Sequence, residues 1–421
     1  MTAQIVAWPR SEPDAASRPR IMDVLAFVAS VLMLLVYAQP WAIFLPDQGV
    51  SDAGSAIERV MFFPMYALGL GLIATRPLSA LKGLAGQPFL VLLLVIVAAS
   101  ATWSIAPDET SRRTVAIVMT TVCGVALGVR WRWPALLEVL ASAFAILSVV
   151  SLILGAVLPD YGRMSEIFPG AWRGLWVEKN AFGGMMTFGV LIFISAGLLN
   201  RQRAALWWPL AGLDFAMLLL STSKTSLVAL VLGCAVMGFV LLAQRGRVVA
   251  VLAVYAAVVG LGALATGIVL APDVFFTLLG KDATLTGRTK IWAAIARLIA
   301  ERPWTGYGYA AVWTDTSGWG PLAWIVKWAG FKPQHAHNSW LEQWLGLGVF
   351  GLAAWALYYL TTLCRAIWAV FAGRGAILAL PFLIVFALVS LTESIALIYN
   401  DLRWVIFVML SIRLAAPEEA R

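Results

Sequence analysis

The amino-acid sequence predicts an all-α, polytopic integral membrane protein with about 12 transmembrane helices. The 421 residues are 61% hydrophobic and only 12% charged, whereas a soluble protein carries about 25% charged residues. Apolar runs near or above the ~20 residues that cross a bilayer recur from end to end. The three cysteines all lie in apolar runs and provide neither a disulfide framework nor the spacing of metal ligands. These observations exclude a soluble globular protein.

The expected elements follow one another with mostly short connections. Residues 1–20 are polar and rich in proline, and are expected to form a disordered arm. The next run is too long for the core of a signal peptide and is predicted to remain as the first span. The expected spans lie near residues 22–45, 60–75, 88–104, 114–129, 134–157, 180–199, 204–221, 226–243, 248–270, 340–364, 376–397 and 403–415. Residues 21–415 are therefore predicted to form one transmembrane domain, followed by a tail of residues 416–421.

Basic residues in the short connections predict the orientation of the spans. If residues 1–20 lie in the cytoplasm, every second connection carries a basic pair, as the positive-inside rule requires. The pairs are Arg76 with Lys82, Arg130 with Arg132, Arg201 with Arg203, Arg245 with Arg247, and Arg365 with Arg374. An even number of spans returns the C-terminus to the cytoplasm. The segment 271–339 then becomes a long outer loop, and a loop of about 69 residues is expected to fold onto the bundle.

Many basic residues lie on the outer side, where the orientation does not need them. They are Arg112, Arg113, Arg163, Arg173, Lys179, Lys224 and seven more in the segment 271–339. One explanation is an anionic ligand on that side. The alternative is that long outer loops are translocated regardless of charge, since most acidic residues are outside as well. The clusters beside helix ends favour the anion.

The long loop contains one segment with a clear helical pattern. Residues Thr286 to Gly306 are predicted to form an amphipathic helix that Pro303 and Gly306 end. Its apolar side comprises Ile291, Trp292, Ile295, Leu298 and Ile299. Such a helix could lie in the membrane interface, with Trp292 at the depth of the headgroups.

The two histidines of the chain, His335 and His337, stand at the lip of the following span. A histidine can act as a general base near neutral pH because its ordinary pKa is ~6.5. The alternative is an interfacial histidine without a chemical role. We expect no metal site, because no other histidine or cysteine lies outside the spans and Glu342 is the nearest acid.

Four segments in order resemble the signature of the O-antigen ligase and Wzy-type polysaccharide polymerase superfamily. Each is weak alone, but all four are expected on the outer side. They are WRGLWVEKNAFGG (172–184), STSKTSLVAL (221–230), GRTKIW with PWTGYGY (287–309), and HAHNSWLEQWLGLGVFGL (335–352). The resemblance covers residues 160–360 closely and the remainder through the number and topology of the spans.

The resemblance implies glycosyl transfer on the periplasmic face of a bacterial inner (cytoplasmic) membrane. The donor would be a glycan carried on undecaprenyl diphosphate, with no metal or other cofactor. The loop 271–339 would be periplasmic and both termini cytoplasmic. Expected partners are this lipid-linked glycan, membrane lipids, and a chain-length regulator or other polysaccharide assembly proteins, with no nucleic acid.

The resemblance also assigns roles to residues. His337 matches the family's catalytic histidine, which is thought to activate the acceptor hydroxyl, and Arg288 matches a catalytic arginine of the loop. Cations would hold the diphosphate and stabilise it as it leaves; the expected set is Arg173, Lys179, Lys224 and Arg288. The expected supporting residues are Asn180, His335, Asn338 and Glu342. Glu178 departs from the pattern, in which many relatives carry histidine, so His337 is left as the histidine base.

Three functions fit this pattern. A polymerase would extend exopolysaccharide or O-antigen from lipid-linked repeat units, and a ligase would transfer the glycan to lipid A-core. Lys224 in STSKT and the EKNAFGG segment favour the exopolysaccharide polymerase branch. The third candidate, a polysaccharide transporter or flippase, would carry charged or broken spans. It is disfavoured because charges within the expected spans are scarce, chiefly Asp214 and Glu393.

Overall fold

The computed structural model describes residues 21–44, 52–165, 168–270, 288–372 and 375–416. In these ranges the chain forms helices and irregular connections, with one isolated β-bridge between Arg163 and Trp172 and no strand. The predicted all-α class is confirmed there. The expected arm 1–20, most of the tail 416–421 and the first part of the loop 271–339 lie outside the described residues.

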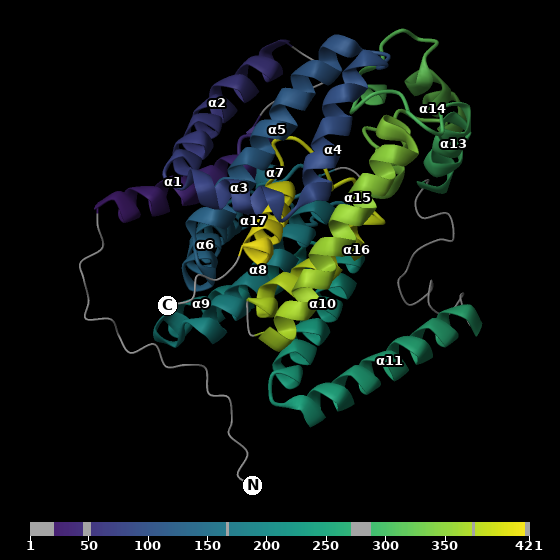
Figure 1. The fold of residues 1–421 in the computed structure, drawn as a ribbon. Coiled ribbons are helices and arrows are strands. Elements are labelled where there is room, and N and C mark those ends of the chain that lie inside the picture. Colours follow the sequence, from purple (N-terminus) through teal and green to yellow (C-terminus); the bar gives the residue numbers. More distant parts are fainter. Residues whose placement is uncertain (1–20, 45–51, 166–167, 271–287, 373–374, 417–421) are drawn as a thin grey trace.

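Most of the helices form one bundle with a smaller helical module at one end, whereas α11 (Arg247–Leu270) extends away from the bundle (Figure 1). Proline stands in the first turn of several helices, where its fixed φ suits the helix and its missing N–H group is not needed. The helices of the first half are α1 (Ile21–Tyr37), α2 (Asp52–Ala74), α3 (Pro77–Ala85), α4 (Pro88–Ala99), α5 (Pro107–Arg130), α6 (Trp133–Val157), α7 (Pro159–Gly162) and α8 (Lys179–Leu199). Those of the second half are α9 (Ala204–Leu220), α10 (Lys224–Ala243), α11 (Arg247–Leu270), α13 (Arg288–Glu301), α14 (Pro321–Ala329), α15 (Ser339–Ala372), α16 (Ala376–Ser390) and α17 (Leu402–Ala415).

Six described helices are long and apolar enough to cross a membrane, namely α5, α6, α8, α9 with the turn before it, α10 and α15. The number becomes seven if the pair 60–74 and 77–85, bent by 97°, counts as one broken span. Further apolar helices of 10–17 residues include α1 and α16. A multi-pass membrane protein is therefore supported, while the prediction of about 12 spans is not confirmed.

Contacts between distant segments define two ends of the bundle. At one end Asp23 pairs with Arg130, and Arg203 pairs with Glu138. We call this the basic end, because Arg76, Arg132, Arg365 and Arg413 line cavities there.

At the opposite end the indole of Trp103 donates a hydrogen bond of 2.9 Å to the Thr305 carbonyl. The segments that carry the family motifs meet there, and we call it the motif end. The membrane face that each end meets stays a prediction.

The module at the motif end has a small core of its own. The apolar side of α13 packs onto α14 and the start of α15, with Ile291, Ile295, Leu298, Ile325 and Leu345 buried together. The Trp292 indole donates a hydrogen bond of 2.9 Å to the Ala336 carbonyl. The predicted amphipathic helix therefore exists, but its apolar side packs against protein. The expectation that this side lies in the membrane interface is wrong.

A break in α15 anchors this module to the bundle. Gly348 has φ +66°, and a Cβ atom there would collide with the Trp304 carbonyl. Glycine adopts such a φ without steric cost. The segment after α13 then runs along the broken turn, where Gly308 N donates to Gly346 O at 2.8 Å and Val349 N donates to Pro303 O at 2.9 Å. The break thus positions the loop that leads to the histidines.

Candidate active site

His337 lies in a tight turn between α14 and α15. Its φ is +51°, in the left-handed region, which is uncommon for residues other than glycine but enriched in His, Asn and Asp. The imidazole of His335 stabilises this turn, because its Nδ1 atom accepts a hydrogen bond of 3.1 Å from the backbone N–H of His337. The two rings lie 4.0 Å apart between centroids. The turn thus fixes the direction of both side chains.

The structure brings His337 together with Arg288 and a third residue, Glu393, that the sequence analysis did not place in the site. His337 Nδ1 lies 3.0 Å from one carboxylate oxygen of Glu393. Arg288 Nη2 donates a hydrogen bond of 2.6 Å to the other. We call these three residues the His337 cluster. All three side chains are largely buried but keep some exposure to solvent.

Glu393 escaped the sequence analysis because the expected span 376–397 placed it inside the membrane. In the structure α16 ends at Ser390, and residues 391–401 form an irregular connection to α17. That prediction is wrong at its C-terminal end. The signal that could have revealed it is the succession Thr392, Glu393 and Ser394, three polar residues that interrupt an otherwise apolar run.

The charge of Glu393 determines which ring nitrogen of His337 carries the hydrogen that faces the carboxylate. Burial alone would raise the pKa of Glu393, but the hydrogen bond with His337 and the Arg288 guanidinium outweigh burial and lower this pKa to about 2. The carboxylate is therefore ionised and can only accept hydrogen bonds. The proton between them must then lie on His337 Nδ1. In a neutral imidazole this leaves the lone pair on Nε2, the arrangement of a histidine general base oriented by a carboxylate.

His335 serves a different purpose from His337. Burial, followed by the charge of the neighbouring His337, lowers the pKa of His335 to about 3. A neutral imidazole whose Nδ1 atom already accepts the His337 N–H group has no lone pair left for a substrate proton. His335 is thus placed as a residue that positions the turn.

Two predicted supporting residues fasten the turn to α15. The side-chain oxygen of Asn338 accepts hydrogen bonds from the backbone N–H groups of Trp340 (2.9 Å) and Leu341 (3.1 Å), which caps the first turn of the helix. Glu342 accepts a hydrogen bond of 3.0 Å from Ala336 N and another of 3.0 Å from the Ser394 hydroxyl. Glu342 therefore joins the segments that hold His337 and Glu393, and it is not within the His337 cluster itself.

The hydroxyl of Ser339 also holds the connection after α16 against the start of α15. It donates a hydrogen bond of 2.9 Å to the Glu393 carbonyl and accepts one of 2.8 Å from Ile395 N. The connection after α16 is thus held against the N-terminal turn of α15. The Glu393 carboxylate is positioned by backbone contacts as well as by its two ionic partners.

A second group of predicted residues meets where α8 and α10 begin. The Lys179 ammonium group donates a hydrogen bond of 3.1 Å to the hydroxyl of Thr222, and the Ser223 hydroxyl donates one of 3.1 Å to Asn180. Lys224 is close enough to interact with Lys179 electrostatically. We call Lys179, Asn180, Ser223 and Lys224 the Lys179 cluster. In the described ranges no carboxylate lies within ion-pair distance of either lysine.

The turn of the Lys179 cluster is strained. Thr222 has φ +54°, an outlier for a β-branched residue. Such conformations cost about 1–3 kcal/mol and persist where the surroundings enforce them, often at functional sites. Here Gly183 allows α8 to approach closely, since a Cβ atom on it would lie 2.8 Å from the Ser223 Cβ atom.

The remaining predicted cation, Arg173, points elsewhere. Its guanidinium group donates hydrogen bonds to the backbone carbonyls of Tyr161 (2.7 Å) and Asp160 (3.2 Å). It thereby orders the connection before α8, and among the described residues it forms no hydrogen bond or ion pair with the Lys179 cluster.

The two clusters lie at the same end of the bundle without being joined. α8 runs antiparallel to α16, since Phe188 packs against Phe382 and the Ser195 hydroxyl further along α8 donates to the Ile377 carbonyl. Lys179 therefore begins α8 at the end where α16 leads into Glu393. Within the described residues, however, no hydrogen bond or ion pair connects the Lys179 cluster to the His337 cluster. The four predicted cations therefore do not form one group in this structure.

The residues around His337 include a set of side chains that could bind a metal ion. One ligand atom each from His335, His337 and Glu393 lies within 4.8 Å of the others, a geometry that could hold a metal ion. The expectation of no metal site counted only Glu342 as a nearby acid, and that premise is wrong. Arg288 opposes a metal, because it already pairs with Glu393 and adds positive charge beside the three candidate ligands.

Comparisons with known proteins agree with the motifs. Residues 209–356 match the family described as O-antigen ligase, a region that contains Lys224, Arg288 and His337 but ends before Glu393. The chain is also 26% identical, over 347 residues, to the exopolysaccharide production protein ExoQ of Rhizobium meliloti (strain 1021), which covers 80% of this chain and 74% of ExoQ. The resemblance of this chain to the O-antigen ligase and Wzy-type polymerase superfamily, on its exopolysaccharide branch, is thereby confirmed.

Proposed function

We propose that this protein is a membrane glycosyltransferase that polymerises undecaprenyl-diphosphate-linked repeat units into exopolysaccharide or O-antigen, on the periplasmic face of the inner membrane. The observation that carries the proposal is the His337–Glu393 pair, which leaves His337 Nε2 free to accept a proton. The lysines of the Lys179 cluster, which lie at the same end of the bundle without a carboxylate partner among the described residues, suit an anionic leaving group. The similarity to an exopolysaccharide production protein supports the polymerase branch.

The reaction follows from these two groups of residues. A sugar hydroxyl of the acceptor attacks the anomeric carbon of the donor glycan while His337 Nε2 takes the hydroxyl proton. The bond between that carbon and the diphosphate oxygen breaks, and undecaprenyl diphosphate leaves with the electron pair. Glu393 keeps His337 in the required tautomer and stabilises the imidazolium that forms, which then loses its proton to water. Lys179 and Lys224 stabilise the charge that grows on the departing diphosphate.

The role that we propose for Arg288 differs from the role that the sequence predicts. Its contact with Glu393 helps to keep that carboxylate ionised. A guanidinium group has five N–H donors, so a phosphate oxygen could share Arg288 with Glu393. Its contact with Glu393, however, makes Arg288 first a positioning residue for the His337–Glu393 pair.

Substitution of His337 tests the proposal. We expect His337→Ala to reduce polymer formation by about 10²–10⁴-fold, the usual contribution of a general base, while protein level and lipid-linked donor are retained and the donor accumulates in cells. His335→Ala should have a milder effect because His335 only supports the turn. Near-normal polymer from His337→Ala would show that the acid–base mechanism is wrong.

An O-antigen ligase is the second candidate, because the matched family carries that description. The two enzymes share the donor and differ in the acceptor. Purified protein supplied only with lipid-linked repeat units should form polymer if it is a polymerase. A requirement for added lipid A-core, with a single transfer to each acceptor, would assign the ligase activity instead.

A further inference from the structure

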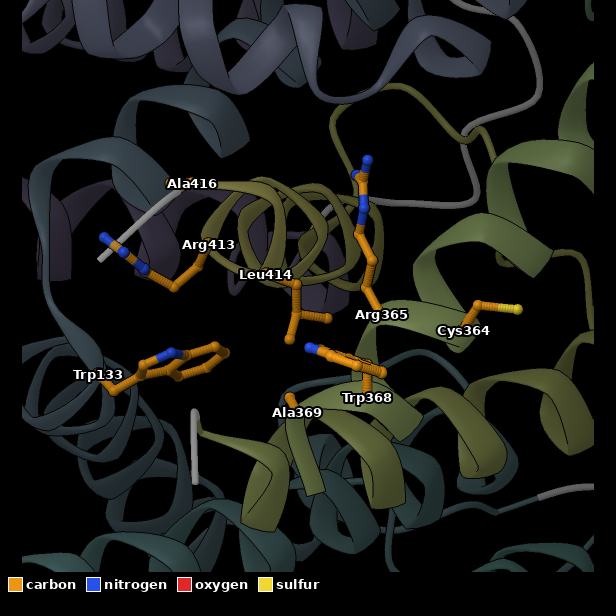
Figure 2. A pocket seen from close by; sticks show the side chains of 8 residues that line it. All are labelled: Trp133, Cys364, Arg365, Trp368, Ala369, Arg413, Leu414 and Ala416. Carbon is orange, nitrogen blue, oxygen red and sulfur yellow. The ribbon is translucent and has the colours of Figure 1, made fainter. Parts of the chain in front are cut away.

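A cavity at the basic end lies far from the proposed reaction. It has a volume of about 230 Å³ and opens between the start of α6, the last turns of α15 and the end of α17 (Figure 2). Its lining residues are Trp133, Cys364, Arg365, Trp368, Ala369, Arg413, Leu414 and Ala416. Two arginines and two tryptophans thus surround a small apolar floor.

The two arginines differ in position from arginines that only set the orientation of a span, which lie exposed in the connections between helices. Arg413 is only 8% exposed, and Arg365 stands within α15 rather than in the connection after it. The Nη1 atom of Arg365 is buried and has no hydrogen-bond partner within the described part of the chain. A buried donor without a partner is costly, so a rotation of the guanidinium that turns this donor toward a ligand oxygen in the cavity would be favoured. Figure 2 shows the two side chains on opposite sides of Leu414, and both arginines line the cavity.

The cavity is open toward the outer surface of α15. Trp368 is 74% exposed there, and Cys364 beside it is exposed as well. On the inner side Trp133 is buried and forms a wall. Tryptophan beside arginine at the end of a membrane-spanning helix is typical of the depth at which lipid headgroups lie.

We propose that this cavity binds the phosphate-bearing headgroup of an anionic membrane lipid. Basic cavities between transmembrane helices are suited to such headgroups. The volume is below the roughly 300–1,000 Å³ of sites that enclose a whole drug-sized ligand, so the headgroup fits inside while the acyl chains extend along α15. This inference does not depend on the proposed glycosyltransferase activity.

The ligand belongs to the leaflet opposite the glycan site. α15 begins at the motif end with Ser339 and carries Arg365 near the basic end, and its part after the break at Gly348 alone runs for about 24 Å from Val349 to Arg365, at about 1.5 Å per residue. That part covers most of the ~30 Å of the hydrocarbon core, and the turn with His337 lies beyond the break. A lipid held by Arg365 therefore cannot be the donor that reaches His337, and it serves as a structural lipid of the basic end.

Lipid retention by the purified full-length protein tests the assignment. Native mass spectrometry would measure binding of phosphatidylglycerol and of zwitterionic phosphatidylcholine. We expect phosphatidylglycerol to bind more tightly, and Arg365→Gln to weaken it by about 10- to 100-fold, the range that the loss of a hydrogen bond to a charged group produces. Trp368→Ala should weaken both lipids without disturbing the fold, because its side chain is exposed. Arg201→Gln, an exposed arginine at the same end, is the matched control and should bind as the wild type does.

Four outcomes would overturn the proposal. Equal binding of the two lipids would show that the cavity is filled by apolar contacts alone. Full competition by millimolar inorganic phosphate would assign it to a free anion. If phosphatidylglycerol bound only after removal of residues 417–421, the natural occupant of the cavity would be the acidic segment with Glu418 and Glu419 instead of a lipid. Unchanged binding by Arg365→Gln, with Arg201→Gln as reference, would remove the arginine from the site.

Discussion

The His337 cluster and the Lys179 cluster lie at the same end of the bundle but balance their charges differently. In the first, the Glu393 carboxylate is paired on both oxygens, with Arg288 and His337. In the second, two lysines lie near each other without a carboxylate partner among the described residues. The charges of the His337 cluster are balanced without substrate, which suits proton transfer because proton transfer depends on a fixed tautomer. The charges of the Lys179 cluster would be balanced only by a bound anion, which suits recognition of a diphosphate.

The largest expected effect comes from removing the charge of Glu393. Glu393→Gln keeps the size of the side chain but can donate to His337 Nδ1, which moves the imidazole proton to Nε2 and removes the lone pair that the reaction needs. We expect a loss of about 10²–10⁴-fold in polymer formation, measured with purified protein and lipid-linked repeat units. Asp108→Asn, an exposed acid at the same end, should stay within twofold of the wild type. Equal activity of the two variants would show that Glu393 does not orient His337.

Neutralising the lysines should give an intermediate effect of a different kind. Lys179→Gln and Lys224→Gln each remove one cation from the leaving group, which should reduce kcat/KM by about 10–100-fold. Lys82→Gln at the basic end is the control. The distinguishing readout is ionic strength, since salt should weaken donor binding by the wild type more than by either variant. The same salt dependence in all proteins would remove the lysines from the diphosphate site.

The comparison of the clusters also shows what the sequence could reveal. His337, Arg288, Lys179 and Lys224 were found because family motifs are local in sequence. Glu393 was missed because its partners His337 and Arg288 are 56 and 105 residues away. The local signal that the helix ends near Ser390 is the polar succession Thr392, Glu393 and Ser394, and that signal does not identify the distant partners of Glu393. The all-α class followed directly from composition, whereas the number of spans did not, because helices such as α4 are shorter than the apolar runs that contain them.

The geometry of the Lys179 cluster can be perturbed without changing a charge. Gly183→Ala would place a methyl group 2.8 Å from the Ser223 Cβ atom and force α8 away from α10. Overpacking of this kind costs about 1–3 kcal/mol. We expect a lower thermal midpoint together with a raised KM for the donor. Gly184→Ala, where a Cβ atom meets nothing within 4 Å, should change neither. Identical behaviour of the two variants would show that the close approach of α8 and α10 is dispensable.

The smallest expected effect is that of a chelator, and it tests whether the His337 cluster is complete by itself. Arg288 occupies one oxygen of Glu393 and His337 Nδ1 the other, and His335 Nδ1 already accepts the His337 N–H group. A divalent cation would have to displace the guanidinium and add like charge beside it. We therefore expect activity within twofold of the untreated protein after prolonged dialysis against EDTA, with Arg288→Gln losing activity in either buffer. Loss of activity in EDTA that one divalent cation restores would instead make His335, His337 and Glu393 a metal centre, and Glu393 would then act as a ligand rather than as the orienting partner of a general base.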